Sequence, residues 1–230
     1  MAPKIIVSYD DTANDRDALV LARLLMDAGA SAQLAYVRHA RAPQRAQDVR
    51  EERRVTEMLE RGATWIRAPR SAHHVVVHAS TGEGLRELAL RERADVIVFG
   101  SDYRTAAGTV RPGTSAQRLL NGGPVAVALA PADLDSRPAL RVSQIGVLAE
   151  DGDDAAQDTA HSLATALGTG VVADEQTADL LVVASSAGAA EGRVALSAVA
   201  EYAIETAGIP VLVVPRGVTV RFPEPALNAA

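Results

Sequence analysis

Residues 94–131 read ADVIVFGSDYRTAAGTVRPGTSAQRLLNGGPVAVALAP, and this stretch decides the fold. Val96–Phe99 and Val125–Ala130 are continuous apolar runs, which are typical of strands buried on both faces of a sheet. A polar, glycine-bearing loop separates them, and a short helix is expected to begin at Thr114. A buried strand that leads through such a loop into a helix often binds an anion, because backbone amides and the helix dipole point into the loop. We therefore expect any ligand site to lie here.

The preceding part of the chain shows the same alternation of strands and helices. Three further short apolar runs predict strands, and the segments between them have either amphipathic spacing or a dense charge pattern typical of an exposed helix. Strands that alternate with helices form βαβ units and a parallel sheet covered on both faces. The expected strands are Ile5–Tyr9, Ala32–Val37 and His74–Ala79, and the expected helices follow Asp10–Thr12, span Gln44–Arg61 and follow a capping-box pair at Ser80 and Glu83.

The pattern restarts near residue 141, which indicates a shortened second copy of the first 131 residues. Its predicted strands are Val142–Ala149, Val171–Ala173, Leu180–Ala184 and Pro210–Val214, with a helix at Ser197–Ala207. The charged helix, one strand and the third helix have no counterpart in this copy. We expect a complete domain at 1–131, a linker at 132–140, a truncated domain at 141–216, and a tail at 217–230 that is either disordered or adds an edge strand at Val218–Phe222.

Composition excludes several classes of protein. The 230 residues are 48% hydrophobic and 23% charged, which suffices for a sizeable core. The net charge of −6 and a pI of about 5.4 argue against nucleic acid as a partner, because that function requires a basic face. Cysteine is absent and Lys4 is the only lysine, which excludes thiolate catalysis and a Walker-type phosphate loop. No signal peptide or membrane-spanning run is evident, so we expect a cytoplasmic protein without a membrane partner.

Two motifs resemble those of the universal stress proteins. One is a strand followed by Asp10–Thr12 and then by Ala18-Leu19. The other is the family's adenine-nucleotide signature: Gly, two residues, Gly, nine residues, Gly, and then Ser or Thr. The spacing is intact here, and tyrosine replaces the middle glycine. The residues in this register are Gly100, Tyr103, Gly113 and Thr114.

The resemblance covers nearly all of Lys4–Pro131 and, more weakly, Val142–Arg216. It implies an α/β fold with an open parallel sheet of order 3-2-1-4-5 and helices on both faces, followed by the shortened copy. It also implies that ATP or AMP, with Mg²⁺ accompanying ATP, binds outside the carboxyl ends of the strands, where the chain reverses direction. The residues that match the family's nucleotide contacts are Ser8, Tyr9, Asp10, Val37, Gly100, Tyr103, Gly113, Thr114 and Ser115.

Several of these residues also have a purely structural interpretation. Asp10 could be an acid favoured by the dipole of the following helix, and Val37 by itself is an ordinary core residue. Thr114 and Gln117 have the spacing of a capping box, which requires no ligand. The ring of Tyr103 would either block the phosphates or stack on the ligand. These alternatives remain open at the level of sequence.

The second half is expected not to bind nucleotide, because it has lost the signature glycines. The same register gives Ala184, Ala187, Ser197 and Ala198, and Glu150 replaces Asp10. No metal site or catalytic constellation is predicted in either half. We therefore expect a stress-response regulator whose first half senses an adenine nucleotide. The alternatives are a nucleotide-free scaffold or interaction module and, on the same fold, a slow ATPase.

The two halves are expected to pair with each other. The strands Val125–Ala130 and Pro210–Val214 are apolar, and an uncovered strand of this kind is an aggregation hazard. The resemblance implies that these fifth strands pair within one chain as a pseudo-dimer. A homodimer through the same strand edges is the corresponding prediction for a second chain.

Overall fold

The computed structural model describes residues 1–39, 45–137, 141–173 and 177–224. Strands and helices alternate in the first half, as the apolar runs and amphipathic segments predict. The elements of this half are β1 Lys4–Ser8, α1 Ala13–Asp27, β2 Ser31–Arg38, α2 Arg45–Trp65, β3 His73–Val77, α3 Thr81–Glu92, β4 Val96–Gly100, α4 Thr114–Leu120 and β5 Ala126–Ala130.

The second half contains fewer elements in the same alternation. It keeps counterparts of the strands β1, β2, β4 and β5 and of the helices α1 and α4, and the short strand predicted at Val171–Ala173 is present one residue earlier. The elements are β6 Gln144–Leu148, α5 Ala155–Leu167, β7 Gly170–Val172, β8 Leu180–Ala184, α6 Ala198–Thr206 and β9 Val211–Val214.

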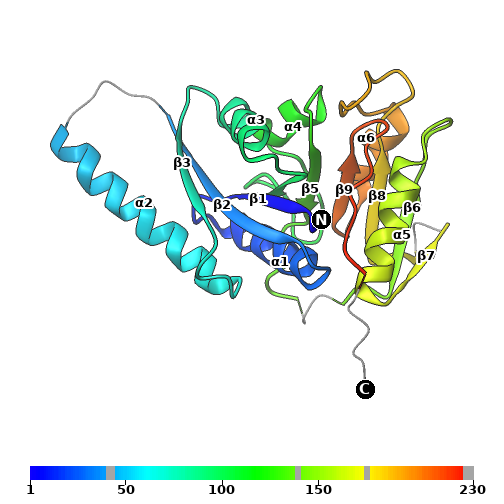
Figure 1. Cartoon of the computed structure of the whole chain (residues 1–230), viewed down its shortest axis with the longest axis horizontal. Coiled ribbons are helices and arrows are strands. Elements are labelled where there is room, and N and C mark those ends of the chain that lie inside the picture. The colour runs from blue at the N-terminus through cyan, green and yellow to red at the C-terminus, as the bar shows by residue number, and fades with distance from the viewer. Residues whose placement is uncertain (40–44, 138–140, 174–176, 225–230) are drawn as a thin grey trace.

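All the named strands belong to one nine-stranded sheet in the order β3-β2-β1-β4-β5-β9-β8-β6-β7. Its first five strands are parallel and have the predicted order 3-2-1-4-5, so the predicted α/β class and strand order are confirmed. Figure 1 shows helices on both faces of this sheet. One core lies between the sheet and α1, α2 and α5, and a second lies between the sheet and α3, α4 and α6.

The two halves join through β5 and β9, which pair antiparallel with Ala128 opposite Leu212 (Figure 1). This is the pairing that the two apolar fifth strands predict. It also occupies the free edge of each strand, since β4 flanks β5 and β8 flanks β9 on their other sides. The predicted homodimer through the strand-five edges is therefore wrong: β3 and β7 are the outer strands of the sheet.

Helix α2 continues through Gly62, beyond its predicted end at Arg61, and ends at Trp65. Gly62 lies where the helix crosses the sheet, and a Cβ atom on it would come within 2.6 Å of Leu34 and 2.9 Å of the Tyr9 ring. The glycine therefore permits close packing of the helix on the sheet and does not end the helix.

The segment after β5 packs against α1, although its composition predicts a linker. Leu134 is only 1% exposed and belongs to the core beneath α1. The buried Asp17 carboxylate on α1 accepts hydrogen bonds from the backbone amides of Asp133 and Asp135, both at 2.9 Å. The part of the predicted linker at 138–140 lies outside the described residues.

The described part of the tail packs along α5 and forms neither an edge strand nor disordered chain. The backbone amides of Val220 and Phe222 donate to the hydroxyls of Thr159 and Ser162, at 3.0 and 2.8 Å. Side-chain hydroxyls thus replace the carbonyl partners that a neighbouring strand would supply, which is why the strand predicted at Val218–Phe222 is absent. Residues 225–230 lie outside the described part of the chain.

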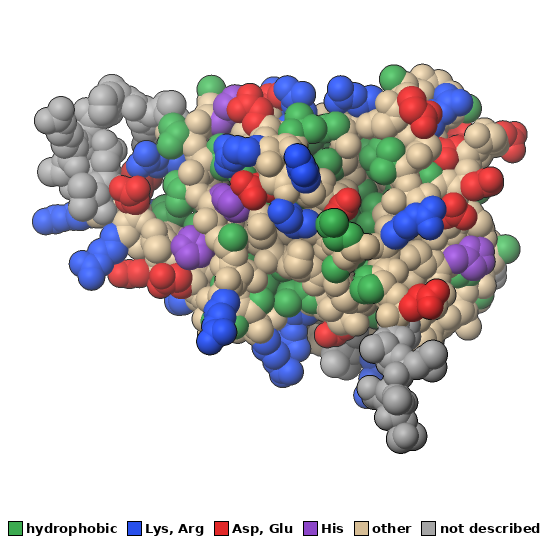
Figure 2. Space-filling view, viewed as in Figure 1, with side chains coloured by type: hydrophobic (Ala, Val, Ile, Leu, Met, Phe, Trp, Pro, Cys, Tyr) green, Lys and Arg blue, Asp and Glu red, His purple; other side chains and the backbone are tan. Residues whose placement is uncertain are grey.

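The surface has a mixed charge pattern, and Figure 2 shows positive and negative side chains interspersed over the face in view. Within the described ranges, none of the helices is both long enough and apolar enough to cross a bilayer.

Candidate functional site

The end of β1 and the start of α1 are built around Asp15. Its carboxyl group accepts hydrogen bonds from the backbone amides of Asp10 and Thr12, at 2.8 and 3.1 Å, in a capping box with Thr12. Burial, together with a hydrogen bond and charge repulsion from the Asp10 side chain, raises the pKa of Asp15 to about 8. Asp15 therefore caps α1, and the Asp10 carboxyl is exposed at the end of the strand. The three-residue spacing of Thr12 and Asp15 is the signal in the sequence that could have predicted this role.

Tyr9 points away from α3 and α4, into the core beneath α1 and α2. Its hydroxyl donates to one oxygen of Asp11 at 2.8 Å, and Arg61 of α2 binds the other oxygen at 3.2 Å. Burial and the Asp11 carboxylate raise the pKa of Tyr9 well above its usual range. The ring is 5% exposed and supports α2 from below, so it is not available to a ligand on the opposite face.

Val37 and Ser8 lie at the carboxyl ends of β2 and β1. Val37 belongs to the core beneath α3, where a Cβ atom on Gly84 would come within 3.2 Å of it, so it lies on the opposite face of the sheet from Tyr9. Ser8 is the last residue of β1, half-buried and aligned with Ala35 of β2. Contact of either residue with a ligand stays a prediction.

Gly100 is required by the packing of α1. A Cβ atom at this position would lie 2.0 Å from the carbonyl oxygen of Asn14. The side-chain amide of Asn14 in turn donates to the carbonyls of Ser101 and Asp102, both at 2.8 Å. The first signature glycine therefore lets α1 approach the end of β4, and this requirement holds without any ligand. Sequence reasoning missed Asn14, because its partners are 87 and 88 residues away along the chain.

The β4–α4 loop, residues 101–113, is closed by one buried serine. The Ser101 hydroxyl donates to the Ala130 carbonyl of β5 at 2.8 Å and accepts from the Arg111 amide at 3.1 Å. A backbone hydrogen bond from Asp102 to Arg111, at 2.8 Å, ties the two arms of the loop together. The loop is therefore an ordered structure held against β5.

Tyr103 is directed into solvent and is 71% exposed. It sits on a turn in which Asp102 accepts hydrogen bonds from the amides of Arg104 and Thr105. The Arg104 guanidinium lies over its ring, 4.9 Å from the ring centroid. The ring is thus not packed against the strand ends, and its contact with a ligand stays a prediction.

Helix α4 starts one residue earlier than a Thr114 cap would require, because Thr114 is already inside the helix. Gly113 is the N-cap, with φ −72° and ψ 169°, and Thr114 is the first helical residue. The predicted capping box of Thr114 and Gln117 is absent, because the Gln117 amide donates instead to the Pro112 carbonyl at 3.1 Å. In the part of the chain that the structure describes, no side chain caps the first turn. Ser115 follows on the helix, and its carbonyl faces Gly82 of α3.

Gly113 is not tightly packed on its side-chain face. The nearest atom to a Cβ placed there would be an Asp102 carboxylate oxygen at 3.8 Å, an ordinary contact distance. Because φ is also negative, neither packing nor backbone conformation demands glycine at this position. The two signature glycines therefore differ: Gly100 is explained by the fold, and Gly113 is not.

The second half repeats the loop and closes its helix. In the β8–α6 loop, residues 185–197, the buried Ser185 hydroxyl donates to Val214 at 2.7 Å and accepts from the Ala195 amide at 3.4 Å. These bonds span 29 and 10 residues, as the Ser101 bonds do in the first half. At the N-cap, however, Ser197 replaces Gly113, and its hydroxyl accepts from the Ala200 amide at 3.2 Å.

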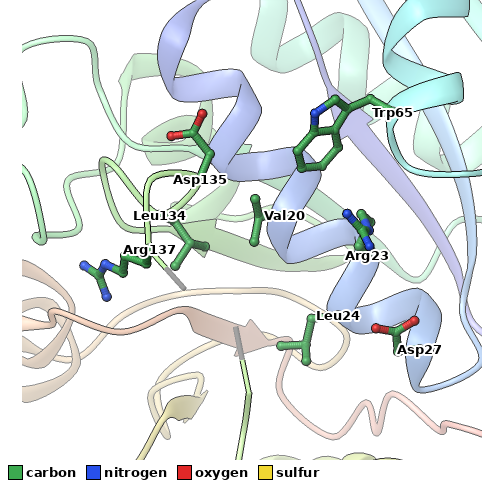
Figure 3. A pocket seen from close by; sticks show the side chains of 8 residues that line it. All are labelled: Val20, Arg23, Leu24, Asp27, Trp65, Leu134, Asp135 and Arg137. Carbon is green, nitrogen blue, oxygen red and sulfur yellow. The ribbon is translucent and has the colours of Figure 1, made fainter. Parts of the chain in front are cut away.

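Two hollows lie near the start of α1 and along α1 itself. The first, of about 410 Å³, adjoins Asp10 and is lined by Asp10, Asp11, Thr12, Tyr36, Arg54, Val55, Met58 and Arg61. The second, of about 230 Å³, lies between α1, the end of α2 and residues 134–137 (Figure 3). Trp65 and Arg23 form one wall of it, with the guanidinium 5.4 Å from the ring centroid. Only the first hollow includes a predicted site residue.

No protein-family model and no curated protein matches the chain. Solved structures do. A universal stress protein from Archaeoglobus fulgidus DSM 4304 superposes with a TM-score of 0.69 at 15% identity, covering 93% of this chain and 98% of that one. A functionally unknown protein from Pseudomonas aeruginosa PAO1 superposes with a TM-score of 0.58 at 14% identity, covering 94% and 93%. At these identities the likeness establishes the fold: this chain has the universal stress protein fold along nearly its whole length.

Proposed function

We propose that the first half binds an adenine nucleotide between the end of β1 and the start of α4, and that the protein is a nucleotide-responsive, cytoplasmic regulator in the stress response. The observation that carries the proposal is the contrast between Gly113 and Ser197. These residues hold the same place in two otherwise matching loops. The serine caps its own helix, whereas the glycine leaves the first-turn amides of α4 without a side-chain acceptor. Phosphate oxygens are suitable acceptors for such amides.

Two further features support the same site. Tyr103 is turned outward into solvent, so its ring does not pack where the signature has no side chain. The Asp10 carboxyl is exposed at the strand end, where an acid can accept hydrogen bonds from ribose hydroxyls. Asn14 connects the start of α1 to the loop, and so relates the Asp10 side of the crevice to the Gly113 side.

The charge of the crevice favours particular nucleotides. The Asp102 carboxylate stands beside Gly113 and would repel an unscreened polyphosphate. A Mg²⁺ ion arriving with ATP would offset that repulsion, and AMP carries less charge to be offset. We therefore expect AMP or Mg-ATP to bind more tightly than free ATP.

Calorimetric titration of the purified protein with AMP and Mg-ATP tests the proposal. The expected result is one site per chain. In Gly113→Ser, which transfers the cap of α6 to α4, affinity should fall by roughly tenfold or more because the hydroxyl competes for the amides. The matched variant Ser197→Gly should leave affinity unchanged. Equal affinity in Gly113→Ser and the wild type would place the site elsewhere, and two sites per chain would contradict the assignment to the first half.

A second candidate function is an interaction module without nucleotide. The observation in its favour is a pair of large apolar side chains displayed on α6, since Val199 is 63% and Tyr202 is 70% exposed. Absorbance of the supernatant after denaturation detects a copurified nucleotide. A sample that carries none, and takes up none at saturating concentration, would favour this candidate over the first.

A further inference from the structure

We infer that the second half of the chain positions the β4–α4 loop of the first half. The consequence for nucleotide affinity rests on the proposed function, whereas the effect on the loop itself does not. The inference concerns the loop tip, residues 108–110, which contacts the connection between α6 and β9.

The second half holds the loop tip by direct contact. The Val110 amide donates to the Ala207 carbonyl at 3.0 Å, and the Val110 side chain is buried in the core shared by α4 and α6. The Gly108 carbonyl lies close to Gly208, so that a Cβ atom added to Gly208 would be only 3.0 Å from that oxygen. The Arg137 guanidinium also donates a hydrogen bond to the Gly208 carbonyl, at 3.0 Å.

The reciprocal contact holds the other end of α4. In the β8–α6 loop, the Val194 amide donates to the Gly123 carbonyl at 2.9 Å, and the Gly122 amide donates to the Val194 carbonyl at 2.7 Å. Val194 is the counterpart of Val110, so each loop grips the turn that follows the other half's helix. This reciprocity is typical of an interface with twofold symmetry. The second half thus contacts both ends of α4. It contacts the β4–α4 loop that precedes the helix, and it forms hydrogen bonds with the turn that follows it.

Inside the first half, the loop tip is held by Ala132 and by the Ser101 hydroxyl, which donates to the Thr109 carbonyl at 3.4 Å. Gly108 donates to the Ala132 carbonyl at 2.8 Å, and the Ala132 amide donates to the Thr109 carbonyl at 2.9 Å. The opposite side of the tip is formed by residues 207–208. Without the contacts from residues 207–208, the loop would sample other conformations. Because only one loop conformation is competent to bind the nucleotide, the apparent affinity falls with the fraction of molecules in that conformation.

The inference also accounts for what the second half has retained. It has lost the glycines of the signature, yet its strands and helices are those that build and back the junction with β5. Of the missing counterparts, α2 and β3 belong to the far side of the first half from β5, whereas α3 packs against α4. The elements at the junction with β5 are all retained.

The test is Gly208→Ala, which adds one Cβ atom against the Gly108 carbonyl from the second half. The matched control is Gly188→Ala, an exposed turn glycine of the same half where a Cβ meets nothing within 4 Å. Hydrogen exchange of the Val110 amide should accelerate by about fivefold or more in Gly208→Ala and stay at the wild-type rate in the control. Nucleotide affinity should weaken in Gly208→Ala and stay at the wild-type value in Gly188→Ala. The melting temperature of both variants should stay near that of the wild type.

Gly208→Val places more atoms at the same point and should enlarge both effects. Wild-type exchange at Val110 in both Gly208 variants would overturn the inference, whatever the nucleotide result. Faster exchange with unchanged affinity would also overturn the positioning role, because the loop would then move without consequence for the ligand. If the wild type takes up no nucleotide, the proposed function fails, and the exchange measurement alone decides whether the second half holds the loop.

Discussion

At the scale of single residues, the signature glycines and the acids beside them have distinct physical roles. Gly100 makes room for the Asn14 carbonyl, whereas a Cβ atom on Gly113 would meet only the Asp102 carboxylate, at an ordinary contact distance. Asp15 caps α1 while buried next to Asp10, and this arrangement opposes its ionisation. Residues that match one motif in the sequence therefore have different physical roles in the fold.

The two glycines should respond differently to the same substitution. Gly100→Ala forces a Cβ atom against the backbone of α1 and should lower the free energy of unfolding by roughly 1–3 kcal/mol. Gly113→Ala meets no close atom and should change it by no more than about 0.5 kcal/mol. Urea unfolding of both variants checks this, and equal losses would contradict the assigned roles.

Asp15 should make stability fall as pH rises. Its pKa is raised on folding, so the folded chain binds this proton more tightly than the unfolded chain does. The resulting stabilisation is complete below an unfolded pKa of about 4 and is lost as pH rises through about 8. The free energy of unfolding is measured for the wild type and for Asp15→Asn from pH 5 to pH 9. Because the amide does not titrate, the wild type should lose stability relative to the variant as pH rises. A wild type that gains stability relative to the variant over this range would contradict the raised pKa.

At the scale of elements, helices here are placed by what they pack against. Helix α2 runs through Gly62 because the sheet lies directly beneath it. Helix α5 holds the tail through two side-chain hydroxyls, and the pattern of apolar residues in the sequence does not predict this role. The Thr159 hydroxyl is buried and accepts the amide of Val220, which is also buried. An amide in that position is expensive to leave without an acceptor.

Thr159→Val keeps the side-chain shape and removes the acceptor. It should lower the free energy of unfolding by roughly 1–3 kcal/mol, because the Val220 amide would be buried unpaired. Thr165→Val, at an exposed position of the same helix, controls for the change in helix propensity and should have little effect. Thermal unfolding by circular dichroism measures both, and a similar shift in the two variants would show that the hydroxyl contributes nothing specific.

At the scale of the whole molecule, the halves share their cores. Residues of β9 and α5 lie in the same buried cluster as residues of β1 and α1, and the sheet is continuous through β5 and β9. Continuity of this kind favours one cooperative transition over two separate ones. The single tryptophan, Trp65, lies at the end of α2 and so reports on the first half alone.

A core substitution in the second half should therefore unfold the first half as well. Leu163→Ala in α5 removes a fully buried side chain and should cost about 2–5 kcal/mol. The urea midpoint measured by Trp65 fluorescence should fall together with the midpoint measured by circular dichroism. A Trp65 midpoint that stays at the wild-type value would show that the halves unfold independently.

The sequence by itself determined the alternation of strands and helices and the trimmed repeat, which follow from apolar periodicity within short windows. The order of the first five strands and the pairing of β5 with β9 were implied by the resemblance to the universal stress proteins, and the need to cover apolar strands supports that pairing. Only the tertiary structure decided that Tyr9 faces α2, that Asn14 explains Gly100, and that the second half walls the loop tip. The reason is that such contacts join residues many tens of positions apart. Packing brings these residues together, and no local pattern in the chain records which ones will meet.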